Sequence, residues 1–599
     1  MNAAVTEVPE TRPSTRLRLI GWLPPVLAAL VAVPYLLRQN AWSEMNNALW
    51  VLQTQTEHVR ATGLPTTFLH LPDEAFYPQH LLYGGFLFSL LAYPAVVLGA
   101  WPTLVIAVVL AFVAIERGVT WFARNLGVPR DVAPLLGLAL VATPYVVSDL
   151  YGRGAFAELM ALAGAALCFG AGTAVLTRPG RLPIGPSLAL VGSAALVAGA
   201  HNLTLLMSAL VAPVVLVIAF AGGALTTTWR RALQVILLLT AGVGLTAAFL
   251  LPTVDFAPDT WIARDDVNAI LRNAALSYGK ASILLSPWPK EPAGAVGGLY
   301  AQASLILLVF PVLAAIVLRR RIGRRTAIAL ALAIAAEILL VWLLTHPLKW
   351  TEFPQAVQTI QFPFRLIPWL GLIGVTACAL VLRKQAPRAL VLTLGALVAL
   401  QVVTAIGLAA THDAPGVPKP ASVTARNPPA SFVTKGLWQP MQYLVRYLPA
   451  GPPPTYPDPP PSTDAKVEAA RIAKLVRAKT GSFDPLTADV VPLGGTDKPG
   501  TVLVAPIAWS PWVRLTGEAR IIGRDSDGFA TILVDHNTNG HWGADARAGC
   551  RSCIGRLGDP SLGSMALGRV VTGVALLGIV AWLGFALWRR RANRAATAA

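Results

Sequence analysis

Apolar residues follow one another in long stretches along this chain, and short polar turns rich in arginine separate the stretches. About twenty apolar residues let an α-helix cross the hydrocarbon core of a bilayer, where backbone polar groups must be satisfied within the helix. The pattern therefore predicts a mainly α, polytopic membrane bundle. We expect about 12 spans, at 19–37, 101–123, 132–150, 155–177, 187–200, 203–222, 232–251, 299–318, 326–345, 366–382, 389–409 and 565–588.

Basic residues gather in alternate turns between these spans, which is typical of cytoplasmic loops. The clusters are Arg12 to Arg18, Arg124 and Arg130, Arg178 and Arg181, Arg230 and Arg231, Arg319 to Arg325, Arg383 to Arg388, and Arg589 to Arg594. Placing them inside predicts a protein of the inner cell membrane with a cytoplasmic N-terminus at 1–18 and a cytoplasmic tail at 589–599. The apolar stretch 81–99 conflicts with this topology if it spans, so we interpret it as a juxtamembrane segment or re-entrant hairpin.

Charge and composition agree with a membrane protein. The 599 residues are 55% hydrophobic and 13% charged, and their formal net charge is +18. Such a charge also occurs in nucleic-acid-binding proteins, but there the basic residues form one patch or one helix face. Here membrane orientation already accounts for the excess, and no nucleic-acid partner is expected.

Three polar segments fall together on the outer side: 38–80, 252–298 and 410–564. The last contains a proline-rich linker at 449–461, which is incompatible with regular helix, followed by a helical pattern at 465–479. Alternating apolar residues then predict strands from 501 to 535, with a turn at 525–528. We therefore expect a small extracytoplasmic β-domain before the last span. No internal repeat favours the repeated architecture of many transporters.

Two of the four cysteines, Cys550 and Cys553, form a C-x-x-C pattern in this outer domain. An oxidising compartment permits a local disulfide between them, which we prefer. A zinc site with His536 and His541, or a redox role, is the alternative. Cys168 and Cys378 lie in apolar spans and are interpreted as packing residues.

Ionisable residues near the outer helix ends are the best candidates for function, because charges within the membrane are costly and usually paired or near water. Asp149, Arg153 and Glu158 flank a Gly-x-Gly break, and Arg365 re-enters the membrane after Gln361. His201 and Asn202 interrupt apolar sequence between two helices. Each has a simpler interpretation: a self-neutralising turn, an arginine extending to the headgroups, or a hydrogen-bonded helix connector.

Three ordered motifs carry a resemblance to a known family: RGAFAE after a span ending in ATPY, the His201–Asn202 pair, and QFPFR before a late span. With them the chain resembles the multi-pass membrane proteins labelled 6-pyruvoyl-tetrahydropterin-synthase-related, which are related to GT-C glycosyltransferases and YfhO-like proteins. The resemblance implies a GT-C-like transmembrane domain over 19–409. The segment WSPWVRLTGEARIIGRDSDGFATILV is similar to the outer β-module that often closes such chains.

The resemblance implies transfer of a sugar from a polyprenyl-phosphate donor to an acceptor on the outer face. Such a reaction needs a carboxylate base and cations that stabilise the departing phosphate. The family usually shows an Asp soon after the first span, where this chain has Asn46 and Asn47. The candidate bases, in order of preference, are Glu44, Asp73 and Glu74.

The other roles that follow from this resemblance concern the donor. Arg153 and Arg365 are the candidates for its phosphate, and Glu158 either orients an arginine or helps to hold a divalent cation. The remaining candidate substrate-binding residues are Asp149, His201, Asn202 and Gln361.

Two other classes of function stay open. A lipid or sugar transporter is suggested by Glu337 within a span, by the helix interruption at His201 and by the re-entrant stretch, although the motifs gather at the outer face. A non-catalytic saccharide-binding or envelope-polysaccharide assembly protein, with assembly partners, would suit the asparagines in the expected place of the acid. Its outer tryptophans, Trp509, Trp512 and Trp542, would stack on sugar rings or form a domain core.

Overall fold

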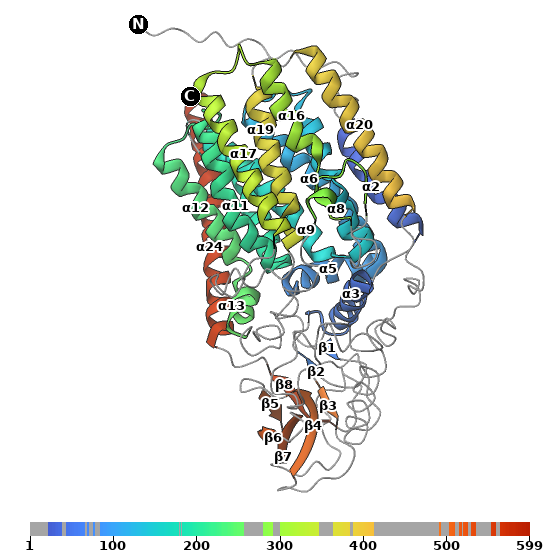
Figure 1. Ribbon diagram of the computed structural model, residues 1–599. Coiled ribbons are helices and arrows are strands. Elements are labelled where there is room, and N and C mark those ends of the chain that lie inside the picture. Colours follow the sequence, from blue (N-terminus) through green and yellow to red (C-terminus); the bar gives the residue numbers. More distant parts are fainter. Residues whose placement is uncertain are drawn as a thin grey trace.

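The computed structural model shows a long helical bundle with two small β-sheets near one of its ends (Figure 1). The structure describes residues 22–38, 43–65, 69–70, 76–77, 84–178, 180, 182–256, 280–290, 300–346, 363–383, 387–411, 490–492, 502–508, 514–517, 519–524, 529–534, 553–558 and 563–598.

Seven helical segments are long and apolar enough to cross a membrane. They are α6 (Ala100–Asn125), α9 (Phe156–Thr177), α11 (Asn202–Ala221), α17 (Arg324–Thr345), η5 (Pro363–Leu366) with α19 (Ile367–Leu382), α20 (Arg388–Thr411) and α24 (Gly563–Ala598). Each coincides with a predicted span. The mainly α, polytopic membrane architecture is thereby confirmed.

The other five predicted spans depart from straight, full-length helices. Three are shorter apolar helices: α2 (Leu23–Arg38), α10 (Ile184–Ala200) and α16 (Leu305–Val317). Two, the predicted spans 132–150 and 232–251, are bent pairs rather than straight helices. The pairs are α7 (Ala133–Val141) with α8 (Pro144–Ser148) and η1 (Asp149–Arg153), bent by 48°, and α12 (Trp229–Gly244) with α13 (Ala247–Phe256), bent by 78°.

The apolar stretch 81–99 contains one helix, α5 (Gly85–Leu98), which joins α6 through Gly99. Gly99 has φ +88°, a conformation that favours glycine. With 14 residues, α5 is shorter than a full span, and within the described residues 84–99 it is a single helix rather than the two arms of a hairpin, the second of the two interpretations. It packs against α3 (Ser43–Thr62) at the end of the bundle that is nearer the sheets (Figure 1).

Small residues allow the central helices to approach closely, as is common where helices pack within membranes. A Cβ added to Gly118 of α6 would lie 2.4 Å from the carbonyl carbon of Ala166 on α9. One added to Gly164 of α9 would lie 3.0 Å from the carbonyl oxygen of Ser193 on α10. Because backbone fills the space that side chains would need, α6, α9 and α10 form the tight centre of the bundle.

The first bend follows from Pro144, which lacks an N–H and disfavours helical geometry at the preceding Thr143. Distant residues satisfy the backbone groups that the break exposes. Gln401 of α20 donates to the Ala139 carbonyl at 2.9 Å, and the Gln302 carbonyl accepts from the Tyr145 N–H at 3.3 Å. Gln302 belongs to a buried non-helical segment, which is tolerated at membrane depth because protein surrounds it.

The second bend contains an inserted side chain. In a continuous helix the N–H of Ala248 would bond to the carbonyl of Gly244, four residues earlier. Instead the hydroxyl of Thr572 on α24 accepts from Ala248 N–H at 3.1 Å and donates to the Gly244 carbonyl at 3.1 Å. A hydroxyl inserted into the hydrogen-bond ladder is a recognised cause of a kink.

The β-structure forms two sheets. A five-stranded sheet has the order β1-β2-β4-β7-β6, and a three-stranded sheet has the order β3-β8-β5. Their strands are β1 (Leu69–His70), β2 (Phe76–Tyr77), β3 (Val490–Pro492), β4 (Val502–Ala508), β5 (Arg514–Gly517), β6 (Ala519–Arg524), β7 (Phe529–Val534) and β8 (Cys553–Gly558). The predicted strands between 501 and 535 are confirmed. Sequence patterns missed the parallel pairing of Phe76 with Ile507, which joins the first outer segment to this module. The linker at 449–461 and the helix at 465–479 lie outside the described residues.

Candidate functional site

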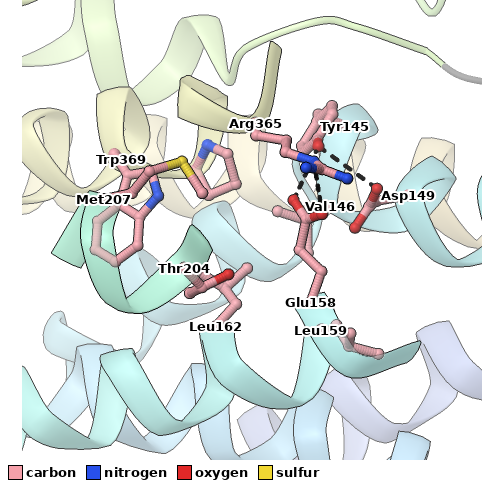
Figure 2. A pocket seen from close by; sticks show the side chains of 11 residues that line it. Tyr145, Val146, Asp149, Glu158, Leu159, Leu162, Thr204, Met207, Arg365 and Trp369 are labelled. Atoms are coloured by element: carbon pink, nitrogen blue, oxygen red, sulfur yellow. Dashed lines mark hydrogen bonds and ion pairs between the residues drawn. The ribbon is translucent and has the colours of Figure 1, made fainter. Parts of the chain in front are cut away.

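A buried ion network joins three separate parts of the chain at one end of the bundle. Figure 2 shows four of its members, Tyr145, Asp149, Glu158 and Arg365. Glu158 lies in the first turn of α9, Arg153 ends η1, and Arg365 lies in η5. Oε2 of Glu158 is 3.1 Å from Nη1 of Arg153 and 3.2 Å from Nε of Arg365. One carboxylate oxygen thus holds two guanidinium groups that are far apart in the sequence.

Asp149 and Tyr145 complete the network. Nη1 of Arg153 also lies 3.0 Å from Oδ1 of Asp149, one helical turn earlier. The Tyr145 hydroxyl is 3.2 Å from Oε1 of Glu158 and 3.4 Å from Oδ1 of Asp149, so it can donate to either acid. Two carboxylates and two guanidinium groups balance one another, which is the condition under which charges are tolerated in a membrane interior.

Tyr145 is a member of the network that was not among the predicted site residues. Its signal was present, because residues four apart lie on one face of a helix and Tyr145, Asp149 and Arg153 have that spacing. The tyrosine belongs to the ATPY motif, which we had used only as a marker of the preceding span. The buried segment around Tyr300 holds this helix, since Ser148 Oγ accepts from the Tyr300 N–H at 2.9 Å.

Local backbone geometry brings the first outer segment to this network. Gly154 ends η1 with φ +79°, and a Cβ there would lie 2.6 Å from the backbone nitrogen of Met45 in α3. The first turn of α3, which contains Glu44 and Asn46, therefore lies against the turn that carries Arg153. Asn46 is fully buried, whereas the side chain of Glu44 is outside the described residues.

His201 and Asn202 have different surroundings. His201 is buried and caps α11, where its Nδ1 accepts from the Thr204 N–H at 3.3 Å. It is close enough to interact electrostatically with Glu158. Asn202 is exposed. Both were candidate substrate-binding residues, but neither lines the cavity beside the network, where Thr204 and Met207 are the residues of α11 (Asn202–Ala221).

The cavity beside the network is small. Along with those two residues it is lined by Tyr145, Val146, Asp149, Glu158, Leu159, Leu162, Arg365, Pro368 and Trp369 (Figure 2). Its volume, measured for the centre of a water-sized sphere, is about 10 Å³, which corresponds to about one water molecule. The conformation described is therefore closed around the ion network, and a sugar phosphate would need the walls to separate.

Several predicted residues lie outside the described part of the chain. These are Asp73, Glu74, Gln361 and Cys550; for Cys553 only the backbone, in β8, is described. The predicted bases and the predicted disulfide stay predictions. Cys168 and Cys378 are free cysteines within the bundle.

Two further buried acids lie away from the network. Glu116 of α6 accepts from Thr120 at 2.7 Å and lies 3.4 Å from Arg117, which is a local arrangement. Glu337 of α17 is buried, and its Oε1 has no hydrogen-bond partner among the described residues. Neither acid is among the residues that line the cavity.

No family model matches the chain, and no curated protein matches it. The Archaeoglobus fulgidus oligosaccharyltransferase, solved in the apo form, is similar in structure with a TM-score of 0.41 and 12% sequence identity. The similarity covers 67% of this chain and 57% of the other, so the chain matches less than two thirds of that protein's length. The family suggested by the motifs is not matched by these comparisons.

Proposed function

We propose that this protein is a membrane glycosyltransferase that moves a sugar from a polyprenyl-phosphate donor to an acceptor on the extracytoplasmic face. The observation that carries the proposal is the convergence of Arg153 and Arg365 on Glu158. Guanidinium groups bind phosphate oxygens through two parallel hydrogen bonds, and a helix end near the membrane surface is where a lipid-borne phosphate arrives.

In this proposal Glu158 is the positioning residue for both arginines. A donor phosphate replaces the carboxylate as their partner when the cavity opens, and the arginines then stabilise the charge that develops on the departing phosphate. Asp149 keeps Arg153 in place during the exchange, because it contacts the same nitrogen. The acceptor's proton goes to a carboxylate of the first outer segment, with Glu44 preferred over Asp73 and Glu74.

The network as described does not fit a divalent cation. The acids that line the cavity, Asp149 and Glu158, already contact arginines and Tyr145. A cation would have to compete with two guanidinium groups for the same oxygens. We therefore assign the compensation of phosphate charge to the arginines alone.

Turnover with purified protein tests the proposal. We would supply a panel of short-chain polyprenyl-phosphate hexoses and pentoses and measure release of polyprenyl phosphate. Arg365→Gln and Arg153→Gln should each lower turnover by about 100-fold or more, the usual loss when one group that stabilises developing charge is removed. The control is Arg117→Gln, which removes the arginine of a different ion pair, that with Glu116. The turnover of this variant should stay within about twofold of that of the parent. Equal activity in all four proteins would refute the proposal.

The second candidate is a saccharide-binding or envelope-polysaccharide assembly protein. The buried Asn46 favours it, because an amide in the place where related chains have an acid cannot take up the acceptor's proton. This alternative predicts saccharide binding without turnover for every donor, and no effect of Glu44→Gln. A transporter would instead move donor across sealed vesicles without transfer. Location in the inner membrane, with both termini cytoplasmic and assembly partners outside, is part of the proposal.

A further inference from the structure

An arginine surface lies at the opposite end of the bundle from the ion network. Arg365 precedes α19 and Arg383 follows it, so the two residues mark opposite ends of one helix. We define the arginine surface by eight residues on neighbouring turns: Arg124, Arg130, Arg319, Arg320, Arg321, Arg324, Arg325 and Arg383. The proposed glycosyl transfer uses none of them.

Contacts join the turns that carry these arginines. Nη2 of Arg383 donates to Oγ1 of Thr326, next to Arg325, at 2.8 Å. A Cβ on Gly127, in the turn with Arg124 and Arg130, would lie 3.7 Å from Cβ of Arg383. The arginines thus form one continuous surface from three turns, rather than separate charged loops.

Negative charge is scarce on this surface. Seven of its arginines are exposed, and none of the eight forms an ion pair with another described residue. Arg124 lies close enough to Arg130 and Arg117 to be repelled by both. The acidic residue of that turn is Asp131. Positive charge on this scale attracts anions and is stabilised when they bind.

The first turn of α17 adds positive charge that no acidic residue of the same turn balances. It contains Arg324 and Arg325 but no acidic residue, and Gly323 supplies no side-chain cap. Basic residues at a helix N-terminus oppose the helix dipole, which favours anions there. The sequence therefore places positive charge where the helix itself already needs a negative partner.

The surface borders apolar side chains that face outward. On α16, which leads into Arg319, the exposed residues include Leu313, Ile316 and Val317. On α17, which leads away from Arg325, they include Ile328 and Leu332. An anion bound here therefore lies where lipid-facing surface meets water, which is the level of phospholipid headgroups.

We propose that the arginine surface is a binding site for acidic phospholipid, with the headgroup phosphate on Arg319 to Arg325 and Arg383 and the acyl chains along α16. A lipid supplies both the anion and the apolar part, whereas free phosphate supplies only the first. Membrane orientation requires only an excess of basic residues on one side. It does not require five arginines within the seven positions 319–325, nor a sixth, Arg383, that is held beside them by Thr326.

Lipid retention by the full-length protein tests this site. Protein purified in neutral detergent would be mixed with phosphatidylglycerol or phosphatidylcholine, and bound lipid would be counted by native mass spectrometry. Arg320→Gln with Arg321→Gln should weaken phosphatidylglycerol binding about 25-fold, since each arginine near an anionic lipid surface corresponds to about fivefold. The matched control is Arg589→Gln with Arg591→Gln on α24, which removes equal charge and should change binding by less than twofold.

Three outcomes would overturn the site. Equal loss in both double variants would show only diffuse attraction between basic residues and acidic lipid. Phosphatidylcholine has the same phosphate but a cationic choline that cancels its charge, so its equal retention would show that the site does not select acidic lipid. Displacement of phosphatidylglycerol by millimolar inorganic phosphate would show a site for a free anion. Because the exposed arginines lie far from the ion network, the test does not depend on glycosyl transfer.

Discussion

The two bent helix pairs differ in what occupies the break. Both interrupt an apolar span, and in both a distant part of the chain satisfies the exposed backbone groups: Gln302 and Gln401 at the first, Thr572 at the second. The first continues into η1 and the buried charges of Asp149 and Arg153. Among the described residues 242–250 of the second break there is no ionisable side chain, and Thr572 of α24 joins α12 and α13 there.

A break in a span is therefore not in itself a functional site. At the second break, one hydroxyl restores a lost hydrogen bond, and the result is a bend that packs two other helices together. At the first break, the bend turns the end of the helix so that Arg153 meets Glu158 of the next span. The combination of a break with compensated charge is the feature that indicates function.

The contrast is tested most strongly at Glu158. Replacing it by glutamine leaves Arg153 and Arg365 with one carboxylate between them, so positive charge is buried without compensation. We expect Glu158→Gln to lower the free energy of unfolding by about 3–5 kcal/mol, measured in mixed micelles. A loss below about 1 kcal/mol would mean that water reaches the network and that its burial is not what holds it together.

A smaller effect is expected at Tyr145. Tyr145→Phe keeps the ring, which lies 5.9 Å from that of Phe364, and removes only the hydroxyl that faces the two acids. Hydrogen bonds to charged groups are worth about 1.5–3 kcal/mol, so the free energy of unfolding should fall by that amount. If the tyrosine also orients Glu158, turnover falls in the same variant without a change in the amount of folded protein. Unchanged stability and turnover together would remove Tyr145 from the network.

The smallest effect is expected at the uncharged break. Thr572→Val preserves shape but removes the inserted hydroxyl, and hydrogen bonds between membrane helices contribute about 0.6–2 kcal/mol. Unfolding in mixed micelles should show a loss in that range, while Thr572→Ser should restore most of it. Turnover should be unaffected. A loss as large as that of Glu158→Gln would show that the two breaks do not differ in the way we describe.

Sequence alone identified most of the bundle, because long apolar stretches have few alternatives to membrane helices. It did not identify the bends. Pro144 gave a local signal for the first, but the second depends on Thr572, more than 300 positions away, and no local pattern contains that information. The pairing of Phe76 with Ile507 was missed for the same reason.

The candidate site was predicted in part. Asp149, Arg153, Glu158 and Arg365 were selected because ionisable residues are unusual in apolar sequence, and the structure brings all four together. Spacing could not show that both arginines share one carboxylate oxygen, since that depends on the packing of η5 against the bundle. The sequence pattern likewise did not predict that Asn202 is exposed, because the residue lies at the junction between two helices.

The hydroxyl of Thr572 has a consequence for biosynthesis. Ribosomes complete α12 and α13 hundreds of residues before α24, so the amide of Ala248 and the carbonyl of Gly244 enter the bilayer without their eventual partner. Until the last helix is inserted, those two groups lack the hydroxyl that satisfies both of them in the finished protein. The contact that completes the bend therefore forms late in assembly, after residue 572 has entered the bilayer.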